Sequence, residues 1–89
     1  MYQKMPLSVF FALKPGDSYL VKWAKDDDAE NGLRLDYERQ TVAENRPEGI
    51  YPTDSSYEWT RDEAHHDPKL EGNALDTGRG LAYFYYDRR

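Results

Sequence analysis

The sequence contains no cysteine. This absence excludes disulfide bonds, cysteine-ligated zinc and thiol nucleophiles. Small secreted domains usually depend on disulfide bonds because their cores are thin, so the composition favours a cytoplasmic location.

Aliphatic residues and long apolar runs are also scarce. Eight Leu, three Val, one Ile and three Phe are the whole supply in 89 residues, which is below the share of about 20% under which a chain is a candidate for disorder. The longest apolar run, residues 7–13, is too short to cross a membrane. We therefore expect no membrane partner.

Aromatic residues are plentiful by comparison. The chain has eight Tyr, two Trp and three Phe, and each ring can bury about 150–250 Å². A chain of this length is enough for one domain. We expect residues 1–89 to form a single small domain whose core is built mainly from aromatic rings.

Local patterns predict a mostly extended chain. Apolar or alternating residues indicate strands at 7–13, 18–25, 33–42 and 80–86, and the last is apolar on both faces, as is typical of a central strand. Turn residues predict a hairpin between the first two strands and pairing of the second with the third. Residues 43–56 and 69–79 are expected to be loops because they are rich in Pro, Gly and polar groups.

Residues 55–66 allow two interpretations. Ser55 and Glu58 have the spacing of a capping box and predict a helix, whereas residues 57–59 also fit a strand. The predicted fold class is all-β or α+β, a small antiparallel sheet or half-barrel of four to five strands with at most one short helix.

The charge is distributed unevenly. The net charge is −5, and residues 26–67 carry thirteen acidic against four basic side chains. Clustered carboxylates repel nucleic acid and attract basic surfaces. We expect a larger protein with a basic surface as partner, without direct binding of nucleic acid and without a cofactor.

The expected docking surface combines these acids with aromatic anchors, because Tyr and Trp often dominate binding energy while acidic groups steer basic partners. Its predicted members are Asp26, Asp27, Asp28, Glu30, Tyr57, Glu58, Trp59, Asp62 and Glu63.

The functional hypothesis that follows is a non-enzymatic acidic inhibitor. It would occupy a basic surface that normally holds nucleic acid. Small, acidic, cysteine-free proteins are common among phage-encoded inhibitors, including anti-CRISPR proteins. This is an analogy at the level of a class and not a match of residues. No residues are assigned a catalytic role.

Two alternatives remain open. A metal-dependent hydrolase or nuclease would use the weak candidate ligands His65, His66 and Asp67, although a catalytic metal needs about three protein ligands. A self-associating structural or virion assembly subunit would pair through the apolar final strand, because an exposed strand is a template for another copy.

Overall fold

Strands account for most of the described chain. The computed structural model describes residues 2–23, 37–53, 58–65, 74–77 and 80–87. In chain order the elements are β1 (Lys4–Met5), α1 (Leu7–Phe10), β2 (Ser18–Trp23), β3 (Glu38–Arg46), β4 (Gly49–Pro52), β5 (Trp59–Thr60), the 3-10 turn η1 (Arg61–Glu63), β6 (Ala64–His65), β7 (Ala74–Thr77) and β8 (Gly80–Tyr86).

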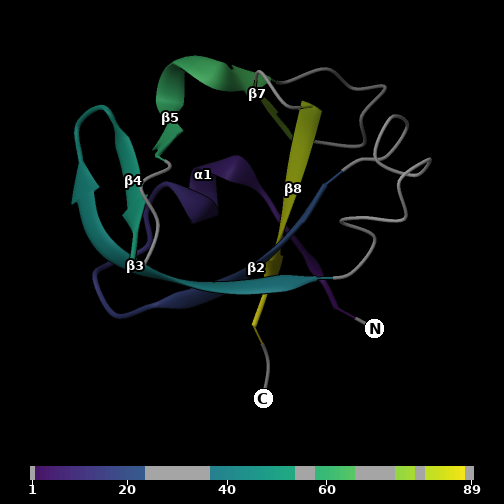
Figure 1. Ribbon diagram of the computed structural model, residues 1–89, viewed down its shortest axis with the longest axis horizontal. Helices are drawn as coiled ribbons and strands as arrows, with labels where there is room; N and C mark the ends of the chain where they lie inside the picture. Colours follow the sequence, from purple (N-terminus) through teal and green to yellow (C-terminus); the bar gives the residue numbers. More distant parts are fainter. Residues whose placement is uncertain (1, 24–36, 54–57, 66–73, 78–79, 88–89) are drawn as a thin grey trace.

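All strands join one antiparallel sheet. Its order is β5-β4-β3-β2-β8-β7-β6, and β1 pairs with β8 beside this path. Figure 1 shows the sheet curling around α1, which lies on its concave side. The predicted fold class is therefore confirmed as a small antiparallel half-barrel with one short helix. The described residues contain eight strands instead of the four or five expected. Three of them, β1, β5 and β6, have only two residues each and are too short to be recognised from a sequence pattern.

The curl depends on β3, which joins the central strands to the β3–β4 hairpin. Its first residues pair with β2, from Ser18↔Thr41 to Val21↔Glu38. Its last residues pair with β4, and the register shifts between Val42 and Glu44. An extra residue in one strand bends it and increases its twist. The bulge therefore turns the β3–β4 hairpin away from the plane of the central strands.

The final strand is central, as its apolar faces predict. β8 pairs with β2 on one side and with β7 and β1 on the other. Its alternate residues Ala82 and Phe84 are fully buried, whereas Tyr83 and Tyr85 point outward and are half-buried. The predicted pairing of residues 18–25 with 33–42 is confirmed by the β2–β3 ladder.

The core is aromatic, also as expected. The ring of Phe10 from α1 stacks on Phe84 with centroids 3.8 Å apart and meets Tyr19 edge-on at 5.0 Å. Trp59 packs edge-on against Phe84 at 5.1 Å. Each of these side chains is at most 1% exposed, and burying a ring of this kind stabilises the fold by about 2–3 kcal/mol.

Polar atoms inside this core are paired. The Trp59 Nε1–H donates to Tyr19 Oη at 3.0 Å and lies 3.1 Å from Gln40 Oε1, while the Tyr19 hydroxyl donates to the same oxygen at 2.7 Å. Burial raises the pKa of Tyr19 far above its ordinary value, so the hydroxyl stays protonated and remains a donor.

The end of β8 is held by an ion pair. The carboxylate of Asp87, 1% exposed, accepts from Arg39 Nε at 2.8 Å and from Ser18 Oγ at 2.7 Å. Asp87 therefore links the C-terminal end of β8 to β2 and β3.

The prediction of a strand at residues 7–13 was wrong, and with it the first hairpin. Residues 7–10 form α1 after Pro6, whose extended backbone occupies the N-cap position. Leu7 and Phe10, three apart, face the core. Periodicity cannot separate a short apolar strand from a short buried helix, and β2 pairs instead with β3 and β8.

Three further segments differ from expectation. The helix predicted across residues 55–66 is absent from the described residues 58–65, which form β5, η1 and β6; the alternative of a strand near Trp59 is closer. The loop predicted at 43–56 contains the end of β3 and all of β4, and the loop predicted at 69–79 contains β7.

Candidate functional site

The β3–β4 hairpin and β5 form the ribbon on which acidic side chains gather. Arg46 and Gly49 are Cα partners, so Pro47 and Glu48 make a two-residue turn. Gly49 also pairs with Thr60 of β5, and a Cβ at Gly49 would collide with the backbone carbonyl oxygen of Trp59. Glycine is therefore required where β5 approaches the hairpin.

The register of these strands places three acids around Tyr51. Glu44 is the Cα partner of Tyr51 across the β3–β4 ladder. Ile50 pairs with Trp59, so extending that register by one residue puts Glu58 opposite Tyr51 on the other side. Paired residues share one face of a sheet and lie close together. We call Glu44, Glu48, Glu58, Arg46 and Tyr51 the acidic surface.

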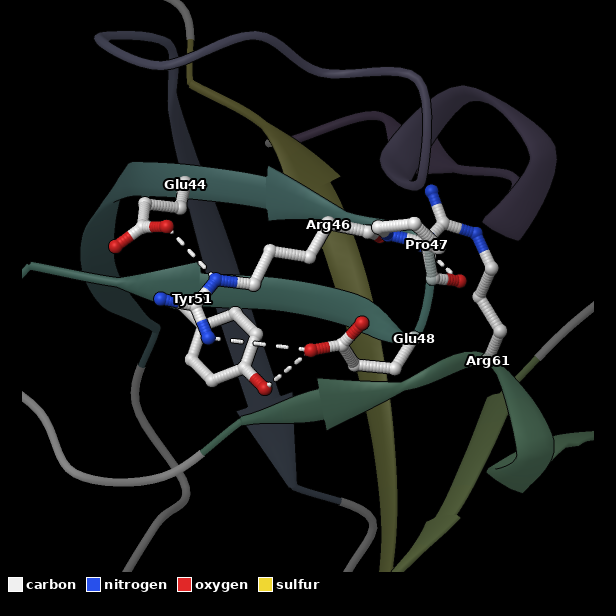
Figure 2. A network of polar contacts seen from close by, with 6 residues as sticks. All are labelled: Glu44, Arg46, Pro47, Glu48, Tyr51 and Arg61. Atoms are coloured by element: carbon white, nitrogen blue, oxygen red, sulfur yellow. Dashed lines mark hydrogen bonds and ion pairs between the residues drawn. The ribbon is translucent and has the colours of Figure 1, made fainter.

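Arg46 organises this surface from its middle (Figure 2). Its Nε donates to Glu44 Oε1 at 2.7 Å, and its Nη1 lies 3.9 Å from Glu48 Oε2. Its guanidinium lies over the ring of Tyr51, 4.3 Å from the centroid. The Tyr51 hydroxyl donates to Glu48 Oε2 at 2.9 Å. The four side chains thus hold one another in place while Glu44, Arg46 and Glu48 stay about half-exposed.

These contacts fix the charge states. The hydrogen bond and charge of Arg46 lower the pKa of Glu44, and the hydrogen bonds of its own backbone and of Tyr51 lower the pKa of Glu48. Hydrogen bonds to Glu58 and Glu48 raise the pKa of Tyr51 to about 12. At neutral pH the tyrosine is therefore protonated and donates its hydroxyl hydrogen to Glu48.

A second arginine near the hairpin, Arg61, donates its hydrogen bonds mainly to backbone carbonyl oxygens. The guanidinium of Arg61 donates to the carbonyl oxygens of Phe11, Arg46 and Pro47 and to Asn45 Oδ1. Figure 2 shows it directed at the hairpin turn. Its charge still helps to lower the pKa of Glu48, so three carboxylates face two guanidinium groups. Among the described residues, Arg46 is the one that forms ion pairs with these acids.

The structure describes only part of the docking surface predicted from the sequence. Glu58 belongs to the acidic surface, Asp62 is exposed in η1, and Glu63 ends η1. The remaining acids and one anchor lie outside the described residues; they are Asp26, Asp27, Asp28, Glu30 and Tyr57.

Trp59 does not fit the role of a surface anchor. It is 1% exposed and packs in the core against Phe84, and its indole N–H is bonded to Tyr19. A fully buried ring of the fold has no surface to offer a partner. The aromatic side chain at the acidic surface is Tyr51, which the sequence placed in a loop. No alternation marks the hairpin, because residues 44–46 are all polar, so the sequence carries no clear signal that locates Tyr51.

The residues considered for a metal remain apart from any described site. His65 ends β6, whereas His66 and Asp67 lie outside the described residues. In the part of the chain that the structure describes, no group of three or more His, Asp or Glu side chains converges as a metal site would require. The same part contains no helix with the length and apolar character that a bilayer span needs.

The route to self-association through the final strand is also restricted. Both sides of β8 are taken by β2, β7 and β1, so this strand has no open edge to pair with another copy. Self-association through other surfaces stays a prediction.

Comparison with known proteins gives no family. No protein-family model matches the chain, and no curated protein or solved structure matches it at a significant level.

Proposed function

We propose that the chain is a binding protein, not an enzyme, and that it docks its acidic surface on a basic groove of a larger protein. A groove that normally holds nucleic acid fits best, because clustered carboxylates can take the place of phosphates. The protein would then act as an inhibitor by occupying the groove. The phage-encoded anti-defence class, which includes anti-CRISPR proteins, stays the closest functional analogy.

One observation carries the proposal. Glu44 of β3, Glu48 of the hairpin turn and Glu58 beside β5 surround Tyr51, and among the described residues Arg46 is the arginine that forms ion pairs with two of them. The acids are held by hydrogen bonds before any partner arrives. Preorganised side chains lose little conformational entropy on binding, so their charge is available for recognition at low cost.

Tyr51 adds an anchor to the charge. Its ring is half-buried and its hydroxyl is fixed between two carboxylates. Tyrosine is enriched among residues that dominate interface energetics because it offers a rigid ring and a polar tip. The surface therefore combines a central ring with a charged rim, an arrangement typical of interfaces.

The test starts with affinity capture from the native host, followed by competition with nucleic acid for the captured partner. We expect wild-type protein to bind a basic partner, to be released by salt and to displace its nucleic acid. Glu48→Gln and Glu58→Gln should each weaken binding severalfold and reduce its salt dependence.

Ser8→Lys is the matched control. Ser8 is exposed on α1, and the substitution changes the net charge by the same single unit away from the acidic surface. If Ser8→Lys weakens binding as much as Glu48→Gln, only overall charge matters and the proposed surface is wrong. Affinity that stays constant across a salt titration would also contradict it.

A further inference from the structure

The outer face of the central strands carries tyrosines and lysines. Lys22 of β2 and Tyr83 of β8 are Cα partners, and Lys4 of β1 is the partner of Tyr85. The residues next to them along each strand, among them Met5, Val21 and Phe84, are buried in the core. Because side chains alternate along a strand, the lysines and tyrosines project from the opposite, convex face.

Two more tyrosines complete this face. The ring of Tyr37, just before β3, meets Tyr85 edge-on at 4.9 Å and meets Tyr2 at 4.8 Å. Tyr2 is 38% exposed, more than any other large apolar or aromatic side chain among the described residues. We call Tyr2, Lys4, Lys22, Tyr37, Tyr83 and Tyr85 the tyrosine–lysine face.

The positive charge of this face is held against its rings. Lys4 Nζ lies 4.5 Å from the centroid of Tyr83, and Lys22 Nζ lies 5.0 Å from that of Tyr37. Arg39 projects on the same side, opposite Leu20, but its guanidinium is paired with Asp87. Within the described part of the chain, the two lysines are therefore the cations that the face can offer to an anion.

We propose that the tyrosine–lysine face binds single-stranded nucleic acid. The lysines would contact phosphates, and the tyrosine rings would stack on unpaired bases, which is how sequence-tolerant single-strand sites work. An acidic polypeptide could pair with the lysines but has no bases to stack on the rings, so the tyrosines favour the nucleic acid.

The net charge of −5 predicted that nucleic acid would be repelled. In the structure, however, this face lies on β1, β8, β2 and the start of β3, whereas the acidic surface lies on the end of β3, β4 and β5. At physiological ionic strength charges are screened over about 8 Å, so a local face can act differently from the whole molecule. The proposal stands without the acidic surface and does not depend on its partner.

The direct test uses purified protein and a fluorescently labelled twelve-nucleotide oligothymidylate, with binding followed by anisotropy. Two phosphate contacts predict that affinity falls about sevenfold when salt is raised from 50 to 200 mM. An abasic oligomer with the same number of phosphates should bind at least about tenfold more weakly, because it cannot stack.

Variants separate the two contributions. Lys22→Glu should reduce affinity and flatten the salt dependence, whereas Lys14→Glu, the same charge change at an exposed turn, should leave both nearly unchanged. Tyr2→Ala should weaken binding to oligothymidylate, and Tyr2→Phe should restore it, because the ring and not the hydroxyl stacks.

Four outcomes would overturn the proposal. These are no binding of oligothymidylate at low salt, equal binding of the abasic oligomer, equal binding of a polyglutamate of the same length, and equal loss of affinity in Lys14→Glu and Lys22→Glu. Equal binding of polyglutamate would assign the face to an acidic protein instead.

Discussion

Two regions of the curled sheet share one core but present opposite chemistry outward. The central strands β1, β2 and β8 carry Lys4 and Lys22 against tyrosine rings. The ribbon of β3, β4 and β5 carries Glu44, Glu48 and Glu58 around Tyr51. The bulge in β3 separates these regions. The net charge of the chain therefore describes neither surface, and binding has to be considered one face at a time.

The largest expected effect tests whether the two regions really share a core. Phe84 of β8 contacts both Phe10 and Trp59. Phe84→Ala should lower the free energy of unfolding by about 4 kcal/mol, because it leaves a cavity among buried rings. Urea unfolding followed by tryptophan fluorescence and by circular dichroism should give one coincident transition; two separated transitions would show that the regions unfold independently.

The next effect is confined to the ribbon. Gly49→Ala should lower the free energy of unfolding by about 3 kcal/mol, because the new methyl group meets the backbone of Trp59 and Thr60. Thermal unfolding measures this change. Gly16→Ala is the comparison, since Gly16 has a φ of 97° but open space around it, and should cost about 1 kcal/mol. Equal losses would mean that the close approach of β5 has no special importance.

Each region also has an arginine in an ion pair, and the two ion pairs should differ in how much they contribute to the stability of the fold. Arg39 neutralises Asp87, whose side chain is 1% exposed, whereas Arg46 neutralises Glu44, which is 55% exposed. Removing the cation from a buried carboxylate is far more costly than removing it from a solvated one. Arg39→Met should therefore lower the urea midpoint more than Arg46→Met does; the reverse order would contradict the burial of Asp87.

The smallest effect concerns pH. The pKa of Glu44 is lowered in the folded protein from an ordinary value of 4.5, mainly by its hydrogen bond to Arg46. This contact therefore contributes stability above about pH 4.5, and the contribution is lost as the pH falls through the lower folded value. Any difference in urea midpoint between wild type and Arg46→Met should be present at pH 7 and should disappear by pH 3. A gap that persists in acid would assign the effect to packing of Arg46 on Tyr51.

The sequence predicted the fold class because aromatic content and alternation are direct signals of a sheet with a ring-filled core. The final strand was predicted correctly in its position and in its central place in the sheet, since residues 80–86 are apolar on both faces. The helix at residues 7–10 was missed because four apolar residues carry no usable period. The strand β4 was missed because Pro and Gly in the turn and at its end resemble a loop.

The acidic surface was harder to predict than the fold. Charge counting identified the acidic segment of the chain but not which acids meet, because that depends on the register of β3, β4 and β5. Trp59 was expected at the surface although its ring is needed in a core with few aliphatic residues. The tyrosine–lysine face depends on Lys4, Tyr37 and Tyr85, which lie far apart in the chain and become neighbours only through pairing with β8.

The guanidinium of Arg61 joins segments that are remote along the chain. It binds the Phe11 carbonyl oxygen across 50 positions and that of Arg46 across 15. Such contacts form only after long loops have closed, which costs conformational entropy, so they tend to form late in folding. We expect the hydrogen bonds of Arg61 to be absent from the transition state for folding. Replacing Arg61 by Met should therefore accelerate unfolding and leave the refolding rate nearly unchanged. The Arg61 side chain then contributes to kinetic stability, because it slows the unfolding of the native state.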